Sequence, residues 1–367
     1  MLGLIQKLPQ LNLILPLGIS FYTFSALSYL IDVKLENISA ERNLTSFVSY
    51  IFFFPKLLAG PIERAQSFLP QINEAKGIST SNFSEGAKLI IWGLFQKLVV
   101  ADRIAIYVNS VDPHYHSGKT ILLSSVLYTF QVYADFSGYT DIARGLAKTL
   151  GFNLMENFKR PLFSVSITEF WRRWHISLSS WVNEYIYNPL TLQLRDYGKK
   201  GIILALFISF VIVGIWHGAT WTFVLFGIIQ GIIISIELLS LKWRRKIFKK
   251  TPSYLTIILG LLFSFSTITL SLILFRASSI EQASDIIKMI FNPVGKIYYG
   301  SAAFILYSLF GILIILLRDI FVEFKGHDIF IIPSRFFIIR SFLYGVLLIL
   351  IMLVGVFDGS QFIYFQF

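Results

Sequence analysis

The sequence contains no cysteine and few charged residues. The absence of cysteine excludes disulfides, thiolate chemistry and metal sites built on cysteine. Charged residues make up only 14% of the 367 residues, whereas hydrophobic residues make up 55%. Soluble domains carry roughly 25% charged residues. The shortfall excludes a soluble globular protein and indicates that much of the surface faces a second, apolar solvent, which is lipid.

Long hydrophobic runs support this interpretation, because about 20 apolar residues span a bilayer as a helix. The clearest runs are Ile202–Ile215, Thr220–Leu241, Tyr254–Phe275, Ala302–Leu317 and Ile338–Phe357. Earlier runs are interrupted by proline or by charge: Leu11–Ile31, Leu44–Ala59, Gly86–Val108 and Ile121–Leu150. We expect about eight to ten hydrophobic segments in all. The predicted fold is all-α, a polytopic transmembrane bundle with re-entrant or interfacial helices around a central funnel.

The net charge of +11 allows two interpretations, nucleic-acid binding or cytoplasmic loops of a membrane protein. The run Lys242–Lys250 lies between two apolar segments, where the enrichment of Lys and Arg in cytoplasmic loops predicts it. We therefore expect the lipid bilayer, and no nucleic acid, as the partner of this charge. With Lys242–Lys250 in the cytoplasm, Lys199 and Lys200 are cytoplasmic too, and His217 lies toward the outer half or the midplane.

The middle of the chain, Asp135 to Lys200, is amphipathic and rich in Trp, Arg and Tyr, which is typical of short helices at the interface or in the interior. Ser166 and Glu169 fit a capping box. The predicted helix runs on through Leu178, so that Glu169 faces Arg172 and Arg173, and Trp171 shares a face with His175. An interfacial helix with Trp anchors and snorkelling Arg is the alternative.

One of the five histidines, His217, lies between two strongly apolar segments. An ionisable group at membrane depth is a functional candidate because its burial is costly, and imidazole is suited to proton transfer near pH 7. Gly214 and Gly218 would let a helix or a substrate approach closely. A histidine that merely binds a carbonyl is the alternative. His114 and His116 lie in a polar turn with too few ligands for a metal site, and His327 is assigned no role.

Other catalytic patterns are missing. The chain has no Gly-x-Ser-x-Gly motif and no phosphate-binding glycine loop, so a covalent intermediate is not indicated. A histidine base acting on an acceptor hydroxyl requires less. Asp135, Asp141, Glu169 and Glu184 could orient a histidine or form structural ion pairs with arginine.

Six ordered segments of the sequence resemble the bacterial membrane-bound O-acyltransferases, in the alginate O-acetylation branch. They are Leu15–Phe24, Phe54–Ile62, Asp135–Ala143, Glu169–Ser179, Trp216–Ala219 and Phe362–Phe367. We expect a single domain over residues 1–367 that lacks N-terminal helices usual in the family. Asn183-Glu184 departs from the family pattern, where an Arg-Asp pair is common.

The resemblance implies acyl transfer across the cytoplasmic membrane of a bacterium. Acetyl-CoA is the expected donor substrate, with no bound cofactor and no metal. The acceptor is an extracytoplasmic polysaccharide, reached with an extracytoplasmic partner of the acyltransferase or esterase type. His217 and His175 match the family's catalytic histidines. Arg172 and Arg173 are expected on the donor side, where arginine suits phosphate, and Trp216 and Asp135 are expected to line the funnel.

Two alternatives stay open. A related branch of the family transfers D-alanine from a carrier protein to teichoic acid. A transporter or channel would carry similar polar residues at membrane depth.

Overall fold

The computed structural model describes residues 18–74, 77, 79–326, 336–358 and 362, and these residues form helices and connecting loops with no strand. The prediction of an all-α fold is confirmed. The N-terminal group comprises four short helices: α1 (Ile19–Lys34), α2 (Leu44–Ile51), α3 (Phe54–Leu57) and α4 (Ala65–Asn73). The predicted segment Leu11–Ile31 begins outside the described residues.

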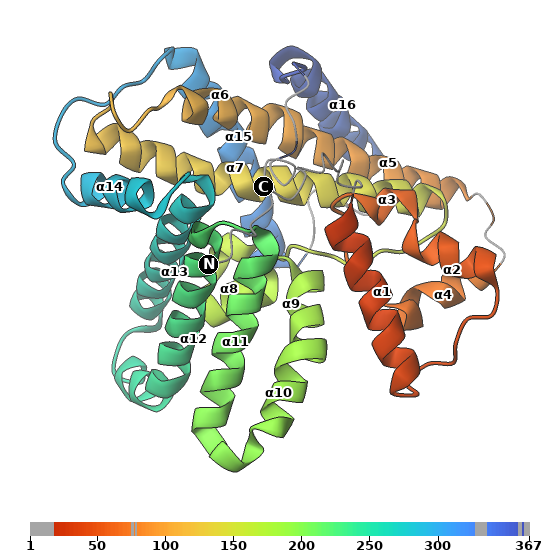
Figure 1. The fold of residues 1–367 in the computed structure, drawn as a ribbon. Helices are drawn as coiled ribbons and strands as arrows, with labels where there is room; N and C mark the ends of the chain where they lie inside the picture. The colour runs from red at the N-terminus through yellow and green to blue at the C-terminus, as the bar shows by residue number, and fades with distance from the viewer. Residues whose placement is uncertain (1–17, 75–76, 78, 327–335, 359–361, 363–367) are drawn as a thin grey trace, which may run out of the picture.

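Two long helical stretches form the centre of the molecule (Figure 1). The first joins α5 (Thr80–Leu94), the π-helical turn η1 (Phe95–Ala101) and α6 (Asp102–Ser110), and the second is α7 (Gly118–Thr149). They lie antiparallel, and glycines pair where they touch: Gly86 with Gly145, and Gly93 with Gly138. A Cβ on Gly93 would lie 2.5 Å from the carbonyl oxygen of Gly138. The backbones can approach this closely only because neither partner has a side chain.

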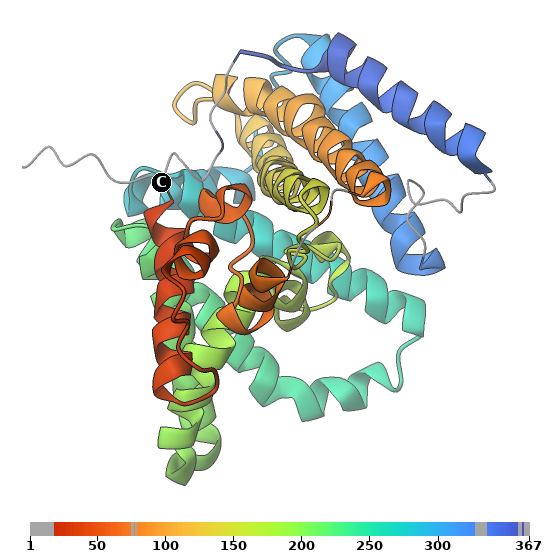
Figure 2. The ribbon, with the colours of Figure 1, turned by 90° about the vertical axis from the view of Figure 1, so that its right-hand side faces the viewer.

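A chain of short helices follows α7 and carries the Trp- and Arg-rich segment. It consists of η2 (Pro161–Phe163), α8 (Ile167–Arg173), α9 (Ile176–Val182), η3 (Asn183–Tyr187), α10 (Asn188–Gln193) and η4 (Arg195–Tyr197). The long apolar helices come next: α11 (Gly198–His217), α12 (Trp221–Phe248) and α13 (Ser253–Arg276). In Figure 1 these three run steeply across the direction of α5 and α7, and Figure 2 shows α5 and α7 foreshortened.

The C-terminal part adds the amphipathic α14 (Ile280–Phe291), α15 (Ala302–Lys325) and α16 (Phe337–Val354). Within the described residues, four helical segments are long and apolar enough to cross a membrane, with mean hydropathy of 2.0 to 2.3: Arg195–His217, Trp221–Phe248, Ser253–Arg276 and Ala302–Lys325. A shorter apolar helix, Ile338–Val354, accompanies them. Leucines and isoleucines such as Leu239, Leu262 and Leu313 point outward from the long helices and are more than half exposed, as a lipid-facing surface requires.

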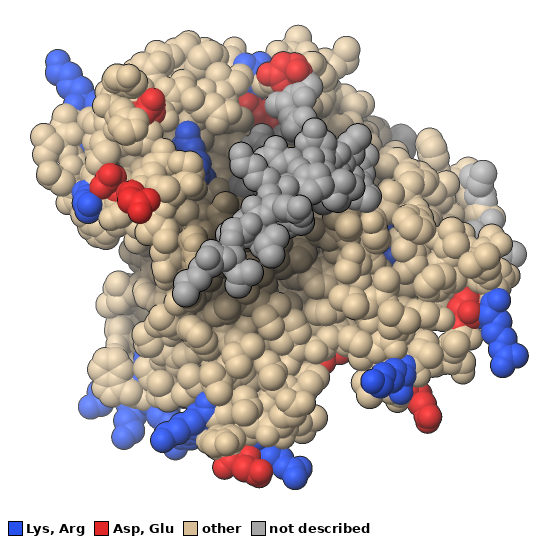
Figure 3. All heavy atoms as spheres, in the orientation of Figure 1, with Lys and Arg blue, Asp and Glu red and all other residues tan. Residues whose placement is uncertain are grey.

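The expectation of about eight to ten hydrophobic segments is therefore only partly matched. The earlier candidates do form helices, but those helices bury charges: Asp32 in α1, Lys56 in α3, Asp102 in α6 and Asp135 in α7. Polar groups at membrane depth must face protein or water, and these four charged side chains face the interior of the protein. Figure 3 shows Lys and Arg gathered at the lower edge of the molecule, over the lower ends of α11 and α12, below a surface of uncharged residues.

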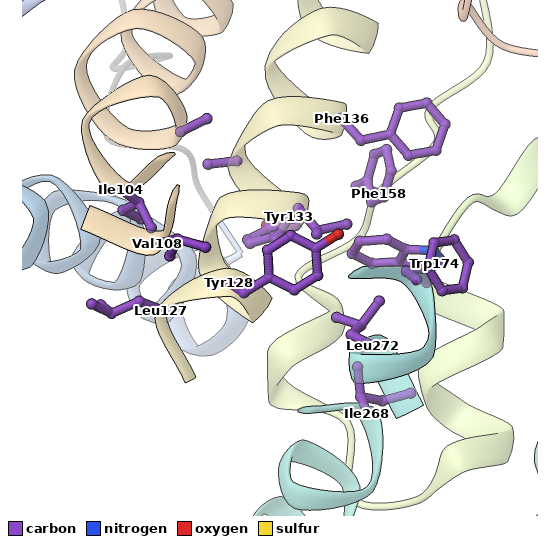
Figure 4. Packing of buried hydrophobic residues seen from close by; sticks show 14 of the residues in the cluster. Ile104, Val108, Leu127, Tyr128, Tyr133, Phe136, Phe158, Trp174, Ile268 and Leu272 are labelled. Atoms are coloured by element: carbon purple, nitrogen blue, oxygen red, sulfur yellow. The ribbon is translucent and has the colours of Figure 1, made fainter. Parts of the chain in front are cut away.

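The main hydrophobic core lies where α7 meets the segment 158–182 and α13. Figure 4 shows part of it, with Tyr133 and Phe136 on α7, Phe158 and Trp174 beside them, and Leu272 on α13 facing Trp174. A smaller cluster joins α1, α2 and α4 around Tyr50 and Phe68.

The glycine contact between α5 and α7 can be tested by adding one methyl group. Gly93→Ala should destabilise the fold by about 1–3 kcal/mol, because the new methyl meets backbone that cannot rotate away. The measurement is thermal unfolding of the detergent-solubilised protein. Gly345→Ala is the matched control: Gly345 also lies in a helix, but nothing lies within 4 Å of its Cβ position. Equal stability of the two variants would contradict the close approach.

Candidate functional site

His217 is the last residue of α11 and is buried, with 9% of its surface exposed. Its ring is surrounded by aromatic rings, with centroids 4.7 Å from Trp216, 4.9 Å from Phe275 and 6.1 Å from Phe226. Gly214 brings α11 against α12, since a Cβ on Gly214 would lie 2.4 Å from the carbonyl oxygen of Phe223. The prediction that this glycine permits a close helix contact is confirmed.

His175 lies at a break in the chain rather than within one helix. The prediction of a helix continuing through Leu178 is wrong, because α8 ends at Arg173 and α9 begins at Ile176. His175 has a φ of 44°, in the left-handed region. Trp171 and His175 therefore do not share a helical face.

Asn157 explains the break. Its carbonyl oxygen accepts a hydrogen bond from the Ile176 amide at 3.0 Å, and its Oδ1 accepts one from the Ser177 amide at 3.0 Å. These two amides belong to the first turn of α9, where helical N–H groups have no partner within the helix. The asparagine thus stabilises a new helix start at the residue after His175.

The break places His175 inside an aromatic shell. Its ring is fully buried, forms a T-shaped pair with the ring of Phe136 at a centroid distance of 4.7 Å, and lies 6.1 Å from Trp216. Trp216 is therefore a neighbour of both histidines. Burial, together with the nearby His217, lowers the pKa of His175 well below its usual range. The His175 ring is accordingly neutral at pH 7.

Arg172 and Arg173, expected together on the donor side, separate. Arg173 donates to Glu169 Oε1 at 2.7 Å and to Glu323 Oε1 at 2.9 Å, and Glu323 also accepts from Arg160 at 2.6 Å. Arg172 is exposed and lines a different surface, described below. Arg173 is thus committed to an ion-pair network between α8, α15 and the loop before α8.

The start of α8 is fixed from two sides. Ser166 accepts a hydrogen bond from the Glu169 amide at 3.1 Å, so the predicted N-cap is confirmed. The buried carboxylate of Glu237, on α12, accepts from the amides of Ile167 and Thr168 at 2.9 Å each and from the Thr168 hydroxyl at 2.6 Å. A carboxylate at a helix N-terminus also complements the helix dipole.

A series of two hydrogen bonds also connects α8 to the apolar helices α12 and α13. The Trp171 indole N–H donates to Gln230 on α12 at 3.0 Å, and Gln230 donates to Ser271 on α13 at 2.8 Å. Neither Glu237 nor Gln230 was among the predicted site residues. The sequence does contain a signal for Glu237, because this residue is the one charged residue in the apolar run Thr220–Leu241.

Asp135 belongs to a buried charge cluster at the π-helical turn. The Lys97 ammonium, in η1, lies 2.7 Å from Asp135 on α7 and 2.8 Å from Asp102 on α6. Turns of this kind are frequent at functional sites. Asp141 and Glu184 form ion pairs with Arg144 and Arg64, at 2.9 Å each.

Three cavities lie in series around His217. A groove of about 1030 Å³ lies between α8–η3, α11 and α12, and three arginines line it: Arg172, Arg244 and Arg245. A cavity of about 20 Å³ touches His217 and is otherwise lined by apolar and aromatic side chains. A polar cavity of about 430 Å³ is lined by residues that include Lys97, Asp135, Arg276 and the segment 218–220 directly after His217.

Adjacent cavities share a wall. Trp171 lines both the arginine groove and the small cavity, and Phe275 lines both the small cavity and the polar cavity. His217 therefore lies between an arginine-lined groove on one side and a polar cavity on the other. The expected central funnel stays a prediction, because these are three separate cavities.

The remaining predicted residues lie apart from this site. His116 Nδ1 accepts from the amide of Asp112 at 3.1 Å in a surface turn. Within the described part of the chain, no group of three or more His, Asp or Glu residues is placed to hold a metal. His327 lies outside the described residues, as does the segment Phe362–Phe367 apart from Phe362, whose ring packs 4.7 Å from that of Tyr139.

Comparison with known proteins adds an independent line of evidence. Residues 19–280 match the sequence model of the membrane-bound O-acyltransferase family. The probable alginate O-acetylase AlgI of Pseudomonas syringae pv. tomato is 36% identical over 282 residues, covering 77% of this chain and 52% of that protein. The peptidoglycan O-acetyltransferase of Helicobacter pylori is 34% identical over 307 residues, covering 76% and 57%. The chain spans about half the length of these curated relatives.

A more distant relative is the teichoic acid D-alanyltransferase of Bacillus subtilis. It is 28% identical over 258 residues, which cover 67% of this chain and 64% of that protein. The O-acetylating relatives are thus more similar to this chain than this D-alanyl-transferring relative is.

The separation of the two arginines has a measurable consequence. Arg173→Gln should lower the stability of the solubilised protein by about 1–3 kcal/mol, because Glu169 and Glu323 lose a charged hydrogen-bond donor. Arg172→Gln, the adjacent control, should unfold at the wild-type temperature, since Arg172 is exposed. Thermal unfolding of both variants in detergent checks this. The opposite order of stabilities would contradict the placement of the pair.

Proposed function

The chain belongs to the membrane-bound O-acyltransferase family, and we propose that it acetylates hydroxyl groups of an extracytoplasmic polysaccharide. The observation that carries this proposal is the place of His217, between an arginine-lined groove and a polar cavity. A base in this position can reach a donor and an acceptor that enter from different sides. The names of the O-acetylating relatives support the acetyl group and the polysaccharide.

The arginine groove suits the donor. Arg172, Arg244 and Arg245 line it, and guanidinium groups bind phosphate oxygens through paired hydrogen bonds. Acetyl-CoA carries such phosphates, and it is a cytoplasmic molecule. The groove also lies toward the end of α12 that continues into Lys242–Lys250, the run that the distribution of positive charge assigns to the cytoplasm. We therefore propose a bacterial cytoplasmic membrane, with the groove open to the inside.

The polar cavity suits the acceptor. Lys97, Asp135, Arg276 and Thr220 offer donors and acceptors of hydrogen bonds to a hydroxyl-rich molecule. The hydroxyl that enters here approaches His217 from the side opposite to the donor. From the resemblance noted above, an extracytoplasmic partner of the esterase type completes delivery to the polysaccharide.

The chemistry is direct transfer. A ring nitrogen of neutral His217 takes the proton of the acceptor hydroxyl. The hydroxyl oxygen attacks the carbonyl carbon of the thioester at the same time. The tetrahedral adduct then collapses, the carbon–sulfur bond breaks, and the proton passes from His217 to the thiolate. The buried indole N–H of Trp216 has no hydrogen-bond partner among the described residues and is suited to stabilise the oxyanion. His175, packed against Trp216, acts as a positioning residue.

D-alanyl transfer is less well supported. A D-alanyl group carries an ammonium, and an ammonium buried without a partner is costly. The residues that line the small cavity beside His217 include no carboxylate. An acetyl group brings only a methyl into that space.

The proposal predicts a strict requirement for the imidazole of His217. His217→Ala and His217→Gln should both lower acetyl transfer about 10²–10⁴-fold, the usual contribution of a general base. The assay is ester-linked acetate on the extracellular polysaccharide, with the abundance of each variant in the membrane measured in parallel. If His217 only satisfies a buried carbonyl, glutamine restores much of the activity. Near-normal acetylation by His217→Gln would therefore overturn the assignment.

The orientation can be tested because the chain has no cysteine. Lys246→Cys should resist an impermeant thiol reagent added to intact cells, whereas Ser278→Cys, at the other end of α13, should react. Both positions are exposed, so accessibility within the folded protein does not limit labelling. Labelling after permeabilisation provides the control for Lys246→Cys. Reaction at position 246 from outside intact cells would reverse the orientation and place the arginine groove on the wrong side.

A further inference from the structure

The small cavity beside His217 has a wall of large apolar side chains. Its lining comprises Val132, Phe170, Trp171, Trp174, Phe226, Ile268, Leu272 and Phe275, together with His217 itself. Figure 4 shows three of them, with Leu272 and Ile268 on α13 directed toward Trp174. Three of the lining side chains, Ile268, Leu272 and Phe275, come from α13.

The volume sets a limit on what this cavity can hold. It measures about 20 Å³, and a single water-sized group needs about 10–15 Å³ on the same scale. One methyl group fits. A second and a third carbon do not fit unless the wall moves.

The wall is held in place by contacts among its own side chains and by a hydrogen bond to Gln230, which does not line the cavity. Trp171 is fixed by its hydrogen bond to Gln230 at 3.0 Å. The ring of Phe226 meets that of Phe275 edge-on at a centroid distance of 4.7 Å, and Phe170 stacks on Trp174 at 5.3 Å. Closely packed interiors resist the insertion of extra carbons because neighbouring side chains have nowhere to go.

We propose that this cavity receives the methyl end of the acyl group during transfer and restricts the donor to a two-carbon acyl chain, with Leu272 as the side chain that closes it. The inference rests on the proposed function and specifies which residues set the length of the acyl group. The carbonyl carbon then lies beside His217, between the groove that delivers the thioester and the cavity that admits the hydroxyl. A hydrophobic pocket discriminates by about 10–200-fold for each methylene that it cannot accommodate.

Leu272→Ala is the decisive variant, since it opens the end of the cavity. Leu274→Ala is the matched control. Leu274 lies on the same helix and is as deeply buried, with 3% of its surface exposed against 6% for Leu272, but it does not line the cavity. Both variants remove the same atoms from the core, so a loss of stability alone affects them alike. Leu272→Val, which removes fewer carbon atoms, replaces Leu272→Ala in the experiment if that variant does not reach the membrane.

The experiment measures acyl transfer by the solubilised chain from acetyl-CoA, propionyl-CoA and butyryl-CoA. The wild type should prefer acetyl over butyryl by about 100-fold or more, two methylenes being excluded. Leu272→Ala should reduce this preference at least about tenfold, while Leu274→Ala keeps the wild-type ratio.

The outcomes separate the two proposals. If the wild type transfers butyryl as readily as acetyl, or if Leu272→Ala acetylates but keeps the wild-type preference, the length limit is refuted while the transferase function stands. If the wild type transfers no acyl group from any of the three donors, the proposed function fails, and the inference fails with it.

Discussion

The buried carboxylate of Glu237 is the contact on which the site depends. It lies in an apolar helix, where an unpaired charge is prohibitively costly. Its oxygens accept three hydrogen bonds from the first residues of α8. Separating α8 from α12 would leave both a buried charge and free helical N–H groups. The hydrogen bonds of Glu237 therefore set the position of α8, and with it the positions of Trp171 and Arg172.

The rest of the site follows from that position. Trp171 becomes the wall between the arginine groove and the small cavity at His217. The close approach of α11 and α12 at Gly214 places His217 at the end of its helix, against Phe226 and Phe275. Apolar aromatic packing then surrounds the histidine on the side where the acyl group is proposed to sit, and the segment 218–220 directly after it lines the polar cavity.

Two kinds of charge serve two different purposes in this protein. Lys97, Asp102 and Asp135 neutralise one another in the interior, where single charges would not be tolerated. Arg172 and Arg245, in contrast, line an open groove without an ion pair holding them in the described structure. A negatively charged ligand can supply the counter-charge for these two arginines. In the proposed function, this division gives the donor side and the acceptor side different chemistry around His217.

The sequence by itself determined the membrane character, the long apolar helices, the N-cap at Ser166 and the exceptional place of His217. These depend on composition or on neighbours within a few residues, which a linear pattern contains. The tertiary structure alone decided the break at His175 and the separation of Arg172 from Arg173. Their causes are distant in sequence. Asn157 stabilises the start of a new helix after His175, and Glu323 forms an ion pair with Arg173 but not with Arg172. Buried polar groups are paired by whichever segment packs opposite them, and that choice is made only when the helices come together.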